Sequence, residues 1–184
     1  MKANRTTLTV VVIVVLVVAG WWLFRRGTAA HTVDLLAQFD STKKQPNAEA
    51  FTVGDLTLNG EARRAIAITP SAGTRLTWNV TVPDDGWLWV WVGFKPEAWD
   101  KPGDGVKFHG GVSDGRAYEE LFSQLVDPFN SLSDRRWVPV KVDLSAYAGE
   151  SVSLILNTNS SMPGKGDNRD NDLALWGSPQ VVVR

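Results

Sequence analysis

The stretch that decides the fold reads Gly86-Trp-Leu-Trp-Val-Trp-Val-Gly-Phe94. Successive side chains of a β-strand point to opposite faces, so each face of this stretch has its own composition. One face carries Trp87, Trp89 and Trp91, and the other carries Leu88, Val90, Val92 and Phe94. Branched and aromatic residues of this kind suit a pleated surface. The pattern predicts a central strand of a β-sandwich, with its aliphatic face in the core between two sheets.

The tryptophan face (Trp87, Trp89 and Trp91) leaves two alternatives open. It either packs beneath a covering segment or lies bare as a binding platform. A bare face of three indoles would be a large apolar patch, which a solitary soluble domain rarely exposes. We therefore expect this face to be buried under residues 31–45 or under a partner.

The N-terminal segment is expected to anchor the protein in a membrane. Thr6–Phe24 carries no charged side chain and is almost wholly apolar. As a helix rising about 1.5 Å per residue it would span roughly 28 Å, close to the thickness of a bilayer core. The alternative is a cleaved signal peptide with its cleavage site near Thr28–Ala30. The length of the apolar run and the intervening Arg25-Arg26 disfavour it.

The expected organisation has four parts. They are a cytoplasmic tail at 1–5, a transmembrane anchor at 6–24, a linker with a short helix at 25–50, and a β-sandwich at 51–184. Basic residues flank both ends of the anchor, so the positive-inside rule gives a slight preference for an inside N-terminus. We expect a single-pass membrane protein with an extracytoplasmic C-terminal domain.

The charge balance excludes one class of partner. All 20 acidic residues follow residue 31, whereas Lys2, Arg5, Arg25 and Arg26 precede it. The remainder has 15 basic against 20 acidic residues, a net charge of −5. A mildly acidic domain without a basic stripe argues against binding nucleic acid.

Residues 31–45 carry spaced apolar side chains and end before Pro46, which predicts a short amphipathic helix. Strand patterns then recur to the end of the chain, at 51–58, 64–68, 76–82, 86–94, 106–113, 116–126, 137–142, 151–157, 173–176 and 180–183. We expect 76–82 and 86–94 to form a hairpin, and Pro139 to place 137–142 at a sheet edge. Some nine strands without a long soluble helix predict an all-β, antiparallel sandwich of the jelly-roll type.

The C-terminal third contains a characteristic set of segments: Trp137, Val142–Glu150, Val152–Leu156 and Asp172–Pro179. Together they resemble the closing signature of galactose-binding-like jelly rolls, the domains used as carbohydrate-binding modules and attached to bacterial envelope proteins. Such modules bind sugars, bind proteins or support neighbouring domains, so the resemblance implies a fold more strongly than a function. Within the signature, Asp143 is expected to cap a turn, Tyr147 to cover the core, and Asp172 to be a buried anchor.

A metal site is weakly indicated. Zinc is disfavoured because the chain has two histidines and no cysteine. The resemblance implies a structural calcium ion, and the polar loop around residues 167–172 offers oxygen ligands in Asp167, Asp170 and Asp172. The alternative is a solvated polar loop. No other cofactor is expected.

A ligand site is expected in loops at one end of the sandwich. Sugars stack on aromatic rings and exchange hydrogen bonds with polar side chains, and the candidates are Trp99, His109, Arg136 and Asp170. Catalysis has little support, because His109 is the only histidine away from the N-terminal segment and Glu119 and Glu120 point oppositely on a strand.

The leading hypothesis is a non-catalytic, membrane-anchored module that binds carbohydrate of the cell envelope or the surroundings. The alternative is a structural or assembly subunit that contacts another membrane protein through the tryptophan face or the loops. A hydrolase is the least favoured of the three.

Overall fold

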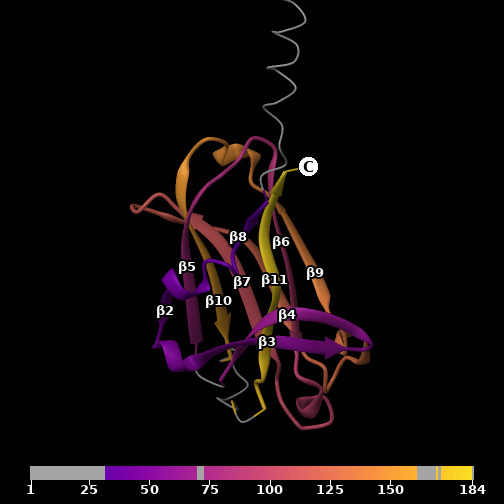
Figure 1. Cartoon of the computed structure of the whole chain (residues 1–184). Coiled ribbons are helices and arrows are strands. Elements are labelled where there is room, and N and C mark those ends of the chain that lie inside the picture. Colours follow the sequence, from indigo (N-terminus) through magenta and orange to yellow (C-terminus); the bar gives the residue numbers. More distant parts are fainter. Residues whose placement is uncertain (1–31, 70–72, 161–168, 170, 184) are drawn as a thin grey trace, which may run out of the picture. The chain divides into compact units, whose positions relative to one another are not determined.

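The computed structural model describes residues 32–69, 73–160, 169 and 171–183 (Figure 1). The predicted anchor at 6–24 lies outside the described residues. Among the residues that are described, no helix has the length and apolarity needed to cross a membrane.

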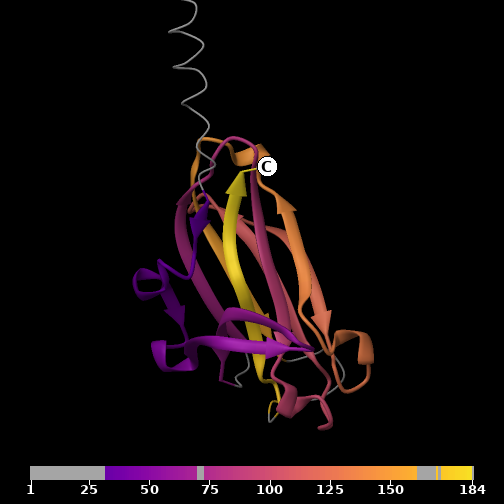
Figure 2. The same ribbon diagram turned by 45° about the vertical axis from the view of Figure 1, so that its right-hand side comes forward.

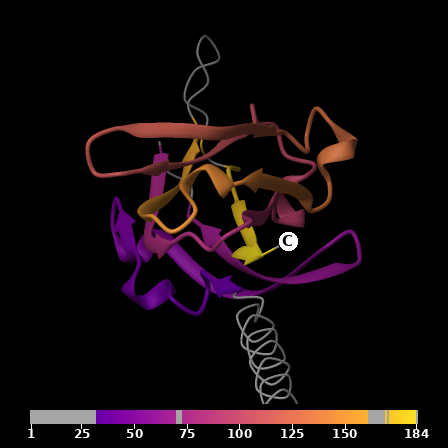
Figure 3. The ribbon, with the colours of Figure 1, turned by 90° about the horizontal axis from the view of Figure 1, so that it is seen from above.

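The domain is a sandwich of two antiparallel sheets, as predicted (Figures 1 and 3). The six-stranded sheet has the order β3 (Phe51–Leu58), β4 (Glu61–Ile68), β11 (Ala174–Val183), β6 (Gly86–Phe94) and β9 (Val138–Asp143), with β1 (Val33–Asp34) paired to β11. The five-stranded sheet has the order β2 (Lys43–Gln45), β5 (Gly73–Thr81), β10 (Ser151–Asn159), β7 (Val106–Ser113) and β8 (Tyr118–Val126).

The core lies between the two sheets and confirms the interpretation of the Gly86–Phe94 strand. Leu88, Val90 and Val92 on β6 are at most 1% exposed. The inward residues of β5 and β10 face them from the other sheet, and Phe108 of β7 meets Trp176 of β11 edge-on, with ring centroids 4.9 Å apart. The predicted alternation of core and outer positions therefore holds in both layers.

The predicted hairpin between 76–82 and 86–94 is wrong, because β5 and β6 belong to different sheets. After β5 the chain crosses from one layer to the other, and Val82 exchanges backbone hydrogen bonds with Gly149 and Glu150. Each strand has one strongly apolar face. Stacking the strands in opposite layers buries both faces against each other, which pairing them side by side in one sheet would not do.

The predicted amphipathic helix at 31–45 is also wrong. The segment forms β1, a 3₁₀ turn at Phe39–Ser41 and β2, and so contributes a strand to each sheet. The carbonyl of Leu35 accepts a hydrogen bond of 2.9 Å from the indole nitrogen of Trp78, and the ammonium of Lys44 donates to the carbonyl of Phe39. Unpaired strand edges on β5 and β11 recruit these residues, which outweighs a weak local helical preference.

The β3–β4 hairpin crosses over β11 and β6 (Figure 2), and it packs on the Trp91 end of the tryptophan face, where residues 31–45 were expected to lie. Leu58 of the hairpin lies over Gly93, where an added Cβ would be 2.6 Å from its methyl group. The indole nitrogen of Trp137 donates to the carbonyl of Glu61 over 3.0 Å. Because β4 pairs with β11 at only three positions, the rest of the hairpin is free to bend over the sheet.

Trp87, Trp89 and Trp91 are each partly buried. The Arg63 guanidinium lies 3.5 Å from the ring centroid of Trp91, and the Lys141 ammonium lies 4.3 Å from that of Trp89. Cations over indole faces are favourable contacts, so these rings have partners within the domain.

Several local predictions are confirmed. Strand β9, which contains Pro139, is at a sheet edge, and the segments 106–113 and 116–126 contain the strands β7 and β8. The Asp143 carboxylate caps its turn by accepting from the backbone N–H of Ser145 at 2.8 Å, and Tyr147 packs against the core. The two short strands expected at 173–183 are one strand, β11, with a register shift between Gly177 and Gln180.

Candidate functional site in a groove on the five-stranded sheet

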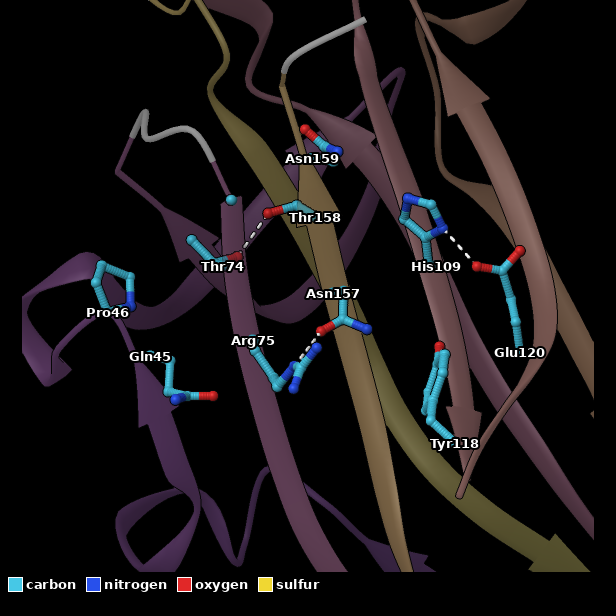
Figure 4. Close-up of a pocket in the computed structure, with 11 residues that line it drawn as sticks. Gln45, Pro46, Thr74, Arg75, His109, Tyr118, Glu120, Asn157, Thr158 and Asn159 are labelled. Atoms are coloured by element: carbon cyan, nitrogen blue, oxygen red, sulfur yellow. Dashed lines mark hydrogen bonds and ion pairs between the residues drawn. The ribbon is translucent and has the colours of Figure 1, made fainter. Parts of the chain in front are cut away.

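A broad groove of about 790 Å³ lies on the outer face of the five-stranded sheet (Figure 4). We call it the sheet groove. Its lining comes from all five strands of that sheet and includes Gln45, Arg75, His109, Tyr118, Glu120 and Asn157. Apart from Tyr118 and Pro46 these lining side chains are polar, which distinguishes the sheet groove from the apolar core beneath it.

Strand register brings the central side chains of the groove into one row. Gln45 of β2 is opposite Arg75 of β5, Arg75 is opposite Asn157 of β10, and Asn157 is opposite His109 of β7. Each of the last three positions is next to a core residue that points the other way, namely Leu76, Leu156 and Phe108. Burial of the core residues therefore forces the polar row outward.

Two contacts hold the β5–β10 side of the groove. The Nε of Arg75 donates to Oδ1 of Asn157 at 2.8 Å, and the hydroxyls of Thr74 and Thr158 are 2.5 Å apart (Figure 4). The threonine pair is buried, whereas Arg75 is exposed to solvent. The arginine is thus positioned by an amide and keeps its charge at the groove surface.

His109 and Glu120 form the opposite side. The Nδ1 of His109 is 2.8 Å from a carboxylate oxygen of Glu120. A register shift between Gly110 and Gly111 inserts one extra residue into β8, a β-bulge of the kind that re-aims side chains. His109 was a predicted site residue, and the structure places it in this groove.

Tyr118 supplies an aromatic surface at the edge of the groove. Its side chain is partly exposed, and its ring lies over Gly111, where an added Cβ would be 2.7 Å from a ring carbon. Burial and the nearby charge of Glu120 raise the pKa of the Tyr118 hydroxyl, while a hydrogen bond with Asn157 opposes the shift. The phenol therefore stays neutral at physiological pH, with one ring face directed to solvent.

The predicted site at the loop end is not assembled by the residues that are described. The indole nitrogen of Trp99 donates to the carbonyl of Phe94 at 3.0 Å, and the ring packs against the core. Arg135 donates to the carbonyl of Trp99 at 2.8 Å. Arg136 is exposed and bonds the carbonyl of Ser133, and neither Trp99 nor Arg136 lines the sheet groove. Asp170 lies outside the described residues.

The calcium candidates are only partly described. Asp167 and Asp170 lie outside the described residues, and Asp172 is 2% exposed, as expected of a buried anchor. One oxygen of Asp172 and both oxygens of Asp104 are buried without a hydrogen-bond partner. Burial, together with the charges of Asp104 and Asp127, raises the pKa of Asp172 to about 6.

Orphaned buried carboxylate oxygens are the donors that a hard cation takes. Asp104 and Asp172 would hold such an ion between two loops and supply a structural cross-link. No group of three or more metal-ligating side chains is found among the residues that are described. The calcium site stays a prediction that rests on these two carboxylates.

Sequence reasoning missed most of the groove: Gln45, Arg75, Tyr118 and Asn157. Their signal was present in part, because each occupies an outward position on a strand with an alternating pattern. The glycine pair Gly110-Gly111 was a further signal, since glycine inside a strand marks close approach of a neighbouring group. These residues lie side by side only because of the register between strands that are far apart in the sequence, and a local pattern does not show that register.

Comparisons with known proteins support the fold. No protein-family profile matches this sequence. An uncharacterized protein from Archaeoglobus fulgidus is 34% identical over 103 residues, which is 55% of this chain and 25% of that protein. The chain therefore spans about a quarter of the length of the curated relative it matches.

Two solved structures resemble the chain along nearly their whole length. The CBM51 module from Clostridium perfringens GH95, in complex with methyl-galactose, has a TM-score of 0.52 and 18% identity and covers 82% of this chain and 99% of the module. TmCBM61, in complex with β-1,4-galactotriose, has a TM-score of 0.51 and 14% identity, with coverage of 82% and 94%. This chain also matches 13% of a longer C. perfringens ZmpB chain, with a TM-score of 0.49.

The structural neighbours of this chain are thus carbohydrate-binding modules with a galactose-binding-like β-sandwich, and the resemblance predicted from the C-terminal third is confirmed. At these identities the likeness shows the fold alone.

Proposed function

We propose that the protein is a non-catalytic carbohydrate-binding module that takes its ligand in the sheet groove. The observation that carries the proposal is the polar row from Gln45 to His109, bordered by the partly exposed ring of Tyr118. The CBM fold of the structural neighbours supports it, because two of them were solved with bound galactosides.

The groove offers both kinds of contact that sugars use. The amides of Gln45 and Asn157 donate and accept hydrogen bonds, and the guanidinium of Arg75 donates them. The open face of the Tyr118 ring suits the apolar C–H face of a sugar. Because the Arg75–Asn157 bond already fixes both side chains, binding loses less side-chain entropy than it would with free rotamers.

The same groove is poorly equipped for glycoside hydrolysis. Hydrolases of this type use a pair of carboxylic acids that flank the scissile bond. Within the described lining, Glu120 is the single carboxylate, and it is paired with His109. A binding role requires no such pair.

The apolar N-terminal segment supports a location at a membrane. We propose that residues 6–24 tether the module to the bilayer and hold the groove outside the cytoplasm, where glycans of the envelope or surroundings are available. Protease protection in intact cells tests this, since degradation of the C-terminal domain by external protease is expected.

The alternative of an assembly subunit used the tryptophan face or the loops as its contact surface. The β3–β4 hairpin and two cations lie over that face instead, so an exposed apolar platform no longer supports it. Docking through the loops stays a prediction, and detergent co-purification of a stoichiometric partner would favour it.

The binding site is tested with the full-length chain on a glycan array, in a polyoxyethylene detergent that carries no sugar headgroup. Tyr118→Ala and Asn157→Ala are expected to weaken binding by about tenfold each, corresponding to about 1.4 kcal/mol. Arg136→Ala is the matched control, since Arg136 is an exposed residue of the loop end.

Unchanged binding in both groove variants, with loss in Arg136→Ala, would move the site to the loop end. Failure of the wild-type chain to bind any glycan would reject the function itself.

A further inference from the structure

We propose that the carbohydrate bound in the sheet groove is an anionic polysaccharide that bears carboxylate groups. Arg75 is the residue that binds these carboxylates. This inference rests on the proposed carbohydrate-binding function and specifies the substrate class.

The first observation is an unpaired cation in the middle of the groove. Among the described residues, no carboxylate lies within 4.0 Å of the Arg75 guanidinium, although four other basic side chains have such partners. Its hydrogen bond to Asn157 uses Nε, so the terminal nitrogens are not engaged in that bond. Arg75 is exposed, and a planar guanidinium with free terminal N–H groups matches a carboxylate in two-point geometry.

The second observation concerns the only carboxylate in the described lining. Glu120 is held 2.8 Å from His109, on the opposite side of the groove from Arg75 (Figure 4). Its charge is therefore directed at the imidazole rather than at the guanidinium. An incoming anion therefore meets Arg75 without first displacing an internal carboxylate.

The third observation is the charge of the surrounding face. Lys43 is opposite Thr77 on β2 and β5, and Lys107 is opposite Asn159 on β7 and β10. Both lysines alternate with inward residues, so they extend from the same outer face as Arg75. Three cations, Lys43, Arg75 and Lys107, thus outnumber the one carboxylate Glu120 among these residues, whereas the chain from residue 32 onward is acidic overall.

This contrast favours an anionic ligand over a neutral one. Charges of one sign along a groove raise the local concentration of a counter-charged ligand and steer its approach. A polymer with a carboxylate on each sugar would place several anions near Arg75, Lys43 and Lys107 at once. A neutral glycan would leave the central guanidinium hydrogen-bonded to hydroxyls alone.

The test compares three polymers with the full-length chain in polyoxyethylene detergent, by affinity electrophoresis and calorimetry. The probes are polygalacturonate, its fully methyl-esterified form and neutral β-1,4-galactan. We expect polygalacturonate to bind at least about tenfold more tightly than its ester, with an affinity that falls as salt is raised.

Arg75→Gln is expected to abolish the preference for the acid, because polygalacturonate affinity falls by a larger factor than galactan affinity, which loses only hydrogen bonds to hydroxyls; Arg75→Lys keeps part of the preference. Arg64→Gln, an exposed arginine of β4 on the other sheet, is the matched control and should change neither affinity. Loss of the preference in Arg64→Gln as well would contradict the role of Arg75.

The outcomes separate the two proposals. Equal or tighter binding of the ester or of galactan overturns the anionic ligand and leaves the carbohydrate-binding function standing. Absence of binding to all three polymers overturns the anionic ligand, and the glycan array then decides separately whether the carbohydrate-binding function stands. A preference for polygalacturonate that persists in Arg75→Gln overturns the assignment of Arg75.

Discussion

The outer faces of the two sheets differ in composition and in accessibility, and the face that is richer in aromatic residues is not the open one. The six-stranded sheet carries the tryptophan face, yet the β3–β4 hairpin and the side chains of Arg63 and Lys141 lie over it. The five-stranded sheet carries a row of ordinary polar residues, and that row lines the open groove. Aromatic richness here marks an internal packing surface, whereas the accessible site is marked by polar side chains placed in register.

The largest effect is expected from a variant that removes a contact between the β3–β4 hairpin and the rest of its sheet. Trp137 is 2% exposed, contacts Leu58 and donates to the carbonyl of Glu61. Trp137→Ala is expected to lower the free energy of unfolding by about 3–5 kcal/mol, because a buried indole and its hydrogen bond are lost. Urea denaturation followed by circular dichroism measures it.

The control for that variant is Leu132→Ala, since Leu132 is 73% exposed and should change stability by less than about 0.5 kcal/mol. An equally small effect of Trp137→Ala would mean that the hairpin does not cover the tryptophan face.

The next test concerns Asp172, in the loop that leads into β11. Its pKa of about 6 in the folded chain lies above the ordinary 3.8, so folding favours the protonated form. The resulting stabilisation is fully present below about pH 4 and is lost as the pH rises through 6. Asp172→Asn should abolish this dependence and raise stability at pH 7 in a chelator by up to about 3 kcal/mol.

The same variant tests the metal prediction. If Asp104 and Asp172 hold calcium, adding the ion should raise the unfolding temperature of the wild type and not that of Asp172→Asn. Equal thermal shifts, or none in either chain, would reject a calcium site at these carboxylates. Parallel pH profiles of the two chains would reject the raised pKa.

A smaller effect is expected from the glycine beneath the groove's aromatic ring. An added Cβ at Gly111 would be 2.1 Å from the carbonyl oxygen of Glu119 and 2.7 Å from the ring of Tyr118. Gly111→Ala should cost about 1–3 kcal/mol and displace the ring, weakening glycan binding. Gly54→Ala is the control, because nothing lies within 4 Å of its added Cβ. Normal glycan affinity in Gly111→Ala would show that the position of the ring is unimportant.

The smallest effect is expected on the covered face itself. Arg63→Gln removes the cation over Trp91 and should reduce stability by about 0.5–1 kcal/mol. Glycan binding should be unaffected, because Arg63 belongs to the other sheet. Loss of binding in this variant, measured on the same glycan array, would contradict the assignment of ligand binding to the five-stranded sheet alone.

Several features were predictable because they depend on neighbouring residues. The two faces of Gly86–Phe94, the edge position of Pro139 and the turn capped by Asp143 each follow from alternation, a missing N–H or a short side-chain bond. The errors at 31–45 and at the supposed 76–94 hairpin have one cause. In both places the pairing partner is a distant strand whose unpaired edge is invisible locally.

The candidate site divides in the same way. His109 was predicted as a site residue, but its neighbour in the sheet, Asn157, could not be assigned to it from the sequence. The Arg75–Asn157 contact joins residues 82 positions apart, and that register depends on the whole sheet. Trp99 was predicted as a site residue because it is an aromatic residue in a loop. In the structure its ring packs against the core, and its indole nitrogen donates to the carbonyl of Phe94.

By itself, the sequence determined that this chain forms a two-layer antiparallel sandwich and which side chains enter its core, because burial of alternating apolar residues is a local pattern with one favourable outcome. Only the tertiary structure decided which outer face is covered and which is open. That choice depends on where the β3–β4 hairpin bends and on how five strands align, and both follow from contacts between residues far apart in the chain.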